Sequence, residues 1–105
     1  MAQDNAVVDE ATRRLVAELD PSRIYLFGSR ARGDAAPDSD YDFFVVVPSG
    51  DERPLKRVRR AYRALRGLGV SKDVIVTTVD RFERMRGLES SLEHEVATEG
   101  RLLYG

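Results

Sequence analysis

Three short apolar runs are separated by longer amphipathic stretches along this chain. The runs cover residues 23–27, 41–47 and 72–78, and all three are rich in β-branched and aromatic side chains. Proline, glycine, serine or aspartate residues stand next to them, which is typical of strands bounded by turns. We therefore predict three strands, and a shorter fourth strand over residues 102–104.

The first stretch outside these runs has helical periodicity. Its apolar positions recur at helical spacing: Val8, Ala11, Leu15 and Leu19. We predict a helix over about residues 4–19, which Asp20 and Pro21 end. Residues 28–33 are expected to form a turn that leads into a short helical start, and residues 35–38 a loop.

A second long helix is predicted over residues 54–68, with Pro54 in the first turn, where proline is tolerated. Its expected apolar stripe consists of Leu55, Val58, Tyr62 and Leu65. Basic side chains surround that stripe: Lys56, Arg57, Arg59, Arg60, Arg63 and Arg66. Such a face is usually only solvated. The alternative is a docking surface, because like charges along one helix attract an acidic protein or RNA.

The rest of the chain adds two shorter helices. One is expected to begin at Asp80, because residues 80–83 form a variant of the capping box, and the other covers residues 92–98. The resulting order is helix, strand, strand, helix, strand, helix. This order predicts an α+β (α/β) fold with a small mixed β-sheet flanked by helices.

Composition narrows the class of protein. With 105 residues, 42% hydrophobic and 33% charged, the chain suits one folded domain over residues 1–105. A net charge of −1 gives no overall attraction to nucleic acid or membrane, and we expect neither to bind directly. The absence of cysteine excludes disulfides and thiolate sites. We see no signal peptide or membrane-spanning run and expect a cytoplasmic protein.

Asp40 and Asp42 are candidate metal ligands. Side chains two apart on a strand point to the same side, and paired carboxylates suit divalent cations better than a core. Asp73, at the start of the next strand, is the expected third ligand, with Asp80 as its rival. The alternative interpretation of Asp40 and Asp42 is that they belong to a solvent-exposed turn and bind nothing. A calcium loop is excluded, since Phe43 stands where that loop requires glycine.

Gly28 and Ser29 close the first strand, where a phosphate-binding turn would need close backbone approach and hydrogen-bond donors. The glycine spacing over residues 28–33 matches half of a P-loop, but Asp34 follows in place of the required lysine. Arg30 would either contact phosphates or pair with surface acids, and the sequence does not decide between these two interpretations. For Arg32 we favour pairing with acidic side chains at the surface.

Together, residues 28–33 (Gly-Ser-Arg-Ala-Arg-Gly) and 39–42 (Ser-Asp-Tyr-Asp) before an apolar strand resemble the signature of the minimal nucleotidyltransferases. These are small members of the DNA polymerase β superfamily. The resemblance implies a polymerase-β-like nucleotidyltransferase fold and transfer of AMP from ATP with two Mg²⁺ ions. It implies catalytic and metal-binding roles for Asp40, Asp42 and Asp73. The residues that it implies for nucleotide binding are Gly28, Ser29, Arg30 and Ser39.

The resemblance also implies a partner. Stand-alone chains of this size are often antitoxins of the MntA-like type, paired with a HEPN-domain toxin, and some transfer AMP to a tyrosine of that toxin. We therefore expect a HEPN toxin or another small helical protein as acceptor. The alternatives are transfer to a small molecule such as an aminoglycoside, with a substrate-binding subunit in trans, and a non-catalytic antitoxin that acts by contact. Homo-oligomerisation stays open.

Overall fold

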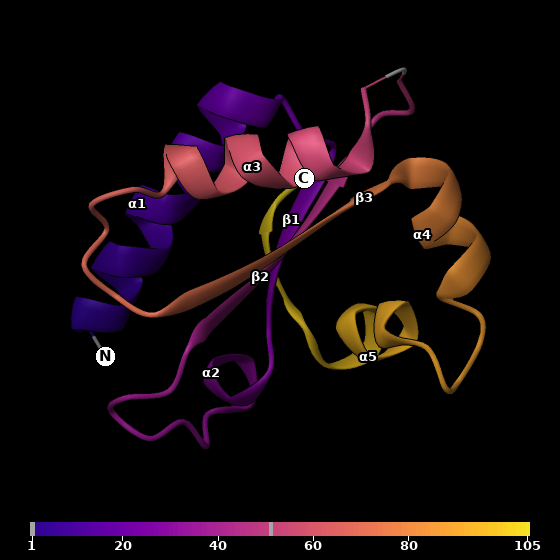
Figure 1. Cartoon of the computed structure of the whole chain (residues 1–105). Helices are drawn as coiled ribbons and strands as arrows, with labels where there is room; N and C mark the ends of the chain where they lie inside the picture. Colours follow the sequence, from indigo (N-terminus) through magenta and orange to yellow (C-terminus); the bar gives the residue numbers. More distant parts are fainter. Residues whose placement is uncertain (1, 51) are drawn as a thin grey trace.

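The structure, a computed structural model, describes residues 2–50 and 52–105 (Figure 1). Its elements are α1 (Ala2–Leu19), β1 (Arg23–Phe27), α2 (Ser29–Arg32), β2 (Tyr41–Val47), α3 (Pro54–Ala64), β3 (Lys72–Thr78), α4 (Val79–Met85), α5 (Leu92–Glu99) and β4 (Arg101–Tyr104). The expected α and β class with a small mixed sheet is confirmed, and β1, β2 and β3 have the expected bounds. None of the described helices has the length and apolar character needed to cross a bilayer.

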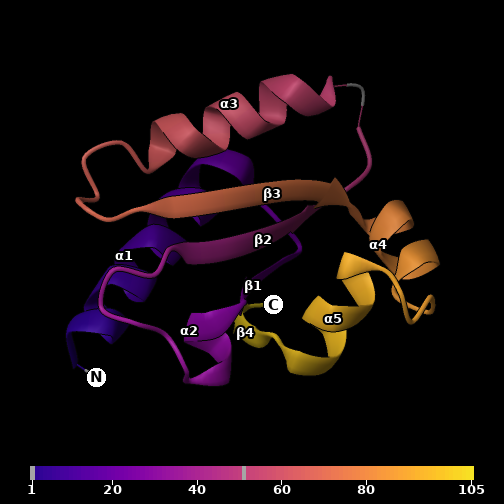
Figure 2. The ribbon, with the colours of Figure 1, turned by 60° about the horizontal axis from the view of Figure 1, so that its bottom comes forward.

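The four strands form one sheet in the order β3-β2-β1-β4 (Figure 2). β1 runs antiparallel to both of its neighbours, β2 and β4. β2 and β3 are parallel, because α3 crosses over between them and returns the chain to the same end of the sheet. The first residues of β2 and β3 therefore lie side by side, and this end of the pair positions the site described below.

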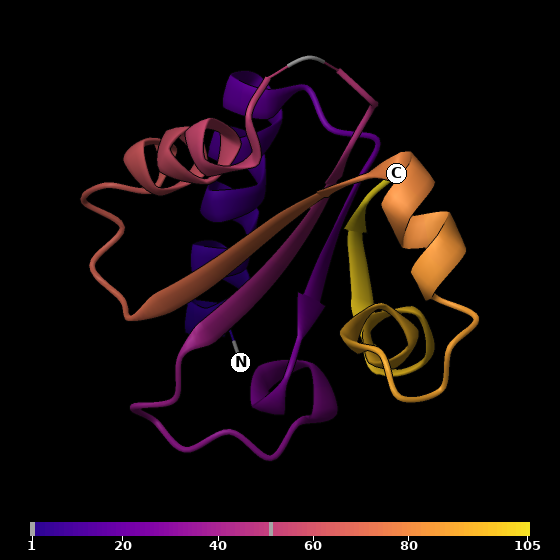
Figure 3. The same ribbon diagram turned by 45° about the vertical axis from the view of Figure 1, so that its right-hand side comes forward.

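Helices cover both faces of the sheet (Figure 3). One face packs against α1 and α3 in a core that includes Leu15, Ile24 and Phe43. The other face packs against α4 and α5 through aromatic contacts, with the ring centroids of Phe44 and Phe82 5.6 Å apart. Phe43 and Phe44 are both fully buried although they point to opposite faces, because β2 is an inner strand covered on both sides.

The buried side of α3 differs from the expected stripe. Arg57, Ala61 and Leu65 are buried at i, i+4 and i+8, whereas Leu55 is 60% exposed and Tyr62 37% exposed. Leu65 is buried as expected. The expectation was wrong for Leu55 and Tyr62 because it counted Arg57 as polar, while an arginine can bury its aliphatic stem. Its guanidinium then donates to a backbone carbonyl, that of Glu52. The helix also ends earlier than expected, at Ala64.

The start of α4 is a second correction. The N-cap is Thr78, whose hydroxyl accepts a hydrogen bond from the Arg81 amide at 3.3 Å, and not Asp80. Thr78 has the extended backbone of the strand end, which an N-cap residue requires. Asp80 lies in the first turn instead, where its carboxylate accepts a hydrogen bond of 2.7 Å from the Ser49 hydroxyl.

Candidate active site

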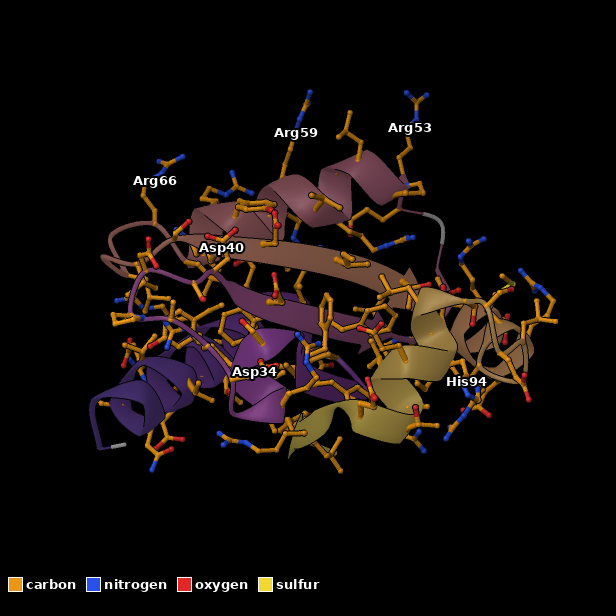
Figure 4. The ribbon with its side chains drawn as sticks, turned by 90° about the horizontal axis from the view of Figure 1, so that it is seen from below. Asp34, Asp40, Arg53, Arg59, Arg66 and His94 are labelled. Atoms are coloured by element: carbon orange, nitrogen blue, oxygen red, sulfur yellow. The ribbon has the colours of Figure 1, made fainter. Side chains whose placement is uncertain are left out.

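Three aspartates gather where β2 and β3 begin. Asp42 and Asp73 are register partners on the two parallel strands, so their side chains leave the sheet on the same face. Asp40 lies two residues before Asp42, outside the strand, and is exposed. Figure 4 shows Asp40 at this end of the sheet. We call Asp40, Asp42 and Asp73 the acid cluster, and the structure thus brings together the three carboxylates expected from the sequence.

The electrostatics of the acid cluster are those of uncompensated negative charge. Burial raises the pKa of Asp42, and the charges of Asp73 and Asp40 raise it further, while Arg32 acts in the opposite direction. Within the described part of the chain, Asp42 has no hydrogen-bond or ion-pair partner. A half-buried carboxylate facing two like charges is stabilised by a cation, so the donor set suits a divalent metal ion.

Hydroxyl groups hold the other two carboxylates. Asp40 accepts a hydrogen bond from the Ser71 side chain, and Asp73 Oδ1 accepts one from the Tyr62 hydroxyl at 3.3 Å. As the side chains stand, no three acids or histidines of residues 2–50 and 52–105 converge closely enough to enclose a metal ion. Neither Ser71 nor Tyr62 could be assigned to the site from sequence, because their contacts depend on how α3 and β3 pack.

The Gly28 turn abuts the acid cluster. Gly28 has φ 74° and ψ −156°, a conformation that is essentially restricted to glycine. A Cβ atom placed there would lie 2.4 Å from Asp42 Oδ2. The turn therefore needs glycine for its backbone and for the close approach of the carboxylate. Ser29 follows as the first residue of α2, so the two features expected to bind nucleotide and metal are adjacent in space.

Arg30, on α2, contacts Ser39 in the loop that leads to Asp40. The Arg30 guanidinium donates to the Ser39 carbonyl at 2.9 Å, and it lies 3.9 Å from the centre of the Tyr41 ring. The Ser39 hydroxyl accepts a hydrogen bond of 2.9 Å from the Ala36 amide. Both side chains thus shape the approach to the acid cluster, and their contact with a nucleotide stays a prediction. Arg32 is exposed and pairs with Asp34, in agreement with its surface reading.

The other candidates lie elsewhere. Asp80 follows the last residues of β3, at the opposite end from Asp73, so it cannot act as the third ligand with Asp42. His94, the only histidine, lies on α5 on the far side from Asp40 (Figure 4). Its Nδ1 is 3.0 Å from the Arg86 carbonyl oxygen, which is a structural contact within the α4–α5 region.

Comparison with known families identifies the chain. A family model described as the nucleotidyltransferase domain matches residues 8–102. This chain belongs to the nucleotidyltransferase domain family. The expected enzyme class, nucleotidyltransferase, is therefore confirmed. No curated protein matches the sequence.

Solved structures share the fold of this nucleotidyltransferase. A candidate nucleotidyltransferase from Sulfolobus solfataricus is 23% identical with a TM-score of 0.65, over 92% of this chain and 76% of that one. A toxin–antitoxin structure with AMP-PNP is 24% identical with a TM-score of 0.64, over 92% and 73%. A toxin–antitoxin MntA–HpeT mutant, with two aspartates changed to glutamate, is 22% identical with a TM-score of 0.61, over 92% and 73%. At these sequence identities, the similarity to the three structures shows a shared fold and nothing further.

Proposed function

We propose that this nucleotidyltransferase transfers AMP from ATP to a hydroxyl of a partner protein, and that the partner is a toxin which it neutralises. The acid cluster beside a glycine turn supplies the donor side of this reaction. The solved toxin–antitoxin neighbour with AMP-PNP, an ATP analogue, supports both the nucleotide and the kind of partner. The observation that carries the proposal is the register pairing of Asp42 with Asp73 next to Gly28.

Each residue of the site has a chemical task in this reaction. Asp40, Asp42 and Asp73 would hold two Mg²⁺ ions, which when bound supply positive charge to the triphosphate and the leaving pyrophosphate. The amides and hydroxyl of the Gly28–Ser29 turn would bind phosphate oxygens. Asp73 would orient the acceptor hydroxyl and take up its proton. A new O–P bond to the acceptor then forms as the bond between the α-phosphorus and pyrophosphate breaks.

The exposed side of α3 is the best candidate for binding the acceptor protein. Leu55, Arg59, Tyr62 and Arg66 recur at helical spacing and are all exposed; we call this set the outer face of α3. Figure 4 shows Arg53, Arg59 and Arg66 projecting outward from the helix and its ends. A groove of about 720 Å³ lies along it and reaches Lys72, next to Asp73.

The chemistry of this face indicates an acidic protein as its partner. In the described part of the chain, Arg59 and Arg66 make no ion pair, so their charge is available to carboxylates of a partner. Leu55 and Tyr62 add apolar surface whose burial favours a protein, at roughly 25 cal/mol per Å². Since the whole chain carries a net charge of −1, a long nucleic acid would meet repulsion beyond this face.

Intact-mass measurement of a partner tests the proposed reaction. The chain is co-expressed with each candidate partner encoded by a neighbouring gene, as wild type and as Asp40→Asn. We expect the partner to gain the mass of one or more AMP units only with the wild-type chain. An unmodified partner that the Asp40→Asn chain still neutralises would point to an antitoxin that acts by contact. If an aminoglycoside gains the AMP instead, the acceptor is a small molecule.

Charge reversal tests where the partner binds. Arg59→Glu with Arg66→Glu should weaken binding of the same partner, and binding should also weaken as salt screens the exposed charges over about 8–10 Å. Arg84→Glu is the matched control, because Arg84 is an exposed arginine of α4 without an ion pair among the described residues. Equal binding by the double variant and the control would exclude the outer face of α3 as the docking surface.

A further inference from the structure

Two carboxylates of the acid cluster are each bound by a neutral hydroxyl that comes from outside β2. Tyr62 reaches from α3 to Asp73. Ser71, in the connection between α3 and β3, reaches Asp40 across a separation of 31 residues. Asp42, between them, has no such partner in the described chain. The acid cluster is therefore held from its two outer sides, and its centre is left open.

The direction of each hydrogen bond is fixed by the groups involved. The Tyr62 oxygen accepts a hydrogen bond of 3.0 Å from the Val74 amide, so its own proton is left for Asp73. The Ser71 hydroxyl donates to Asp40, since an ionised carboxylate only accepts. The Ser71 carbonyl accepts from the Tyr41 amide at 3.0 Å, which ties the position of the serine to the first residue of β2.

These hydroxyls act against the repulsion within the cluster. Asp40 and Asp73 are exposed, and like charges would turn them away from Asp42 and into solvent. A hydroxyl donor holds one oxygen of a carboxylate without neutralising its charge, so the other oxygen stays available to a cation. An arginine or lysine in the same place would instead compete with the metal ion for the carboxylate.

We propose that Tyr62 and Ser71 are positioning residues of the metal site, which orient Asp73 and Asp40 before the metal ion binds. This inference rests on the proposed function, in which the acid cluster holds Mg²⁺. Outer hydrogen-bond partners of metal ligands commonly change metal affinity by about 10- to 100-fold. Both residues act on the metal site through a carboxylate, and for Tyr62 this is a task of the hydroxyl, whereas its exposed ring belongs to the outer face of α3.

Binding of Mn²⁺, followed by the electron paramagnetic resonance of the free ion, tests the proposal without any turnover. Tyr62→Phe and Ser71→Ala should each raise the dissociation constant for Mn²⁺ about 10-fold while the protein stays folded. Tyr62→Phe should also lower the melting temperature, because the Val74 amide loses its acceptor. Tyr104→Phe is the control for the tyrosine, because Tyr104 is 39% exposed and Tyr62 37%. Ser49→Ala is the control for the serine, because Ser49 makes the same kind of bond to Asp80 at the other end of the strands.

The outcomes separate this proposal from the function on which it rests. Unchanged or tighter Mn²⁺ binding by both Tyr62→Phe and Ser71→Ala would overturn the positioning role, and so would an equal loss in Ser49→Ala. If the wild type binds Mn²⁺ no better than Asp42→Asn does, the acid cluster is not a metal site, and the metal-dependent function falls with the positioning role.

Discussion

The two ends of the parallel pair β2–β3 carry the same hydrogen bond but have different surroundings. At the beginning of the strands Ser71 donates to Asp40, and at their end Ser49 donates to Asp80. Asp80 stands alone in the first turn of α4, where a negative charge is favourable. Asp40 instead stands beside two further carboxylates, and the pKa of Asp42 among them is raised by burial and, in addition, by the charges of Asp73 and Asp40. The two aspartates thus differ in the charges around them and not in their own hydrogen bond.

The largest expected difference between the two ends is in catalysis. Asp42→Asn keeps the shape of the side chain but removes its charge, so Mg²⁺-dependent binding of ATP and AMP transfer should fall at least about a hundred-fold. Asp80→Asn should leave both unchanged. Calorimetry with ATP and Mg²⁺, together with the rate of pyrophosphate release, measures the two effects. Undiminished transfer by Asp42→Asn would show that the acid cluster is not the metal site.

Glycine variants sharpen the comparison by separating backbone strain from contact with the site. Gly28→Ala and Gly33→Ala both force alanine to a positive φ, of 74° and 87°, and each should cost about 1–3 kcal/mol of stability. Only the Gly28 variant places a Cβ against Asp42, since nothing lies within 4 Å of a Cβ at Gly33.

The two glycine variants should therefore differ in ligand binding more than in stability. We expect Gly28→Ala to lose binding of ATP and Mn²⁺, and Gly33→Ala to retain it. Thermal unfolding and calorimetry on both proteins give the two quantities. Loss of binding in both variants would mean that strain in the turn, and not the contact with Asp42, controls the site.

The smallest expected effect is on stability and its pH dependence, measured without divalent metal. The folded-state pKa of Asp42 is raised by burial and by its acidic neighbours, so its ionised form costs stability above that pKa. The cost disappears below the unfolded pKa. Asp42→Asn should therefore melt higher than the wild type at neutral pH, by less than about 4 °C, since 1 kcal/mol corresponds to about 4–8 °C. The difference should shrink as the pH falls.

Much of the fold could be predicted from the short-range pattern of apolar and turn-forming residues. The strands over residues 23–27, 41–47 and 72–78 are apolar runs bounded by turn-forming residues, and the structure gives them the same bounds. Spacing also singled out Asp40 and Asp42 as a pair, although Asp40 lies just before β2 begins. Asp73 was expected as the third acid at the start of the next strand, and its pairing with Asp42 is a finding of the structure.

The remaining features depend on packing that no spacing rule contains. The buried side of α3 includes Arg57, whose aliphatic stem lies in the core, and this moves Leu55 to the surface. Thr78 replaced Asp80 as the cap because the strand ends directly at the helix. Tyr62 lies 11 residues from Asp73 along the chain, and Ser71 lies 31 residues from Asp40. Only the packing of α3 on the sheet brings these residues together.

The bond between the Tyr62 hydroxyl and the Val74 amide has a consequence for solubility. β3 is an edge strand, and its outward amides could pair with a strand of another molecule and extend the sheet. Tyr62 already occupies the amide of Val74 and covers that stretch of the edge with a ring. Sheet extension, and the aggregation that begins with it, is therefore blocked at Val74, next to the exposed carboxylate of Asp73.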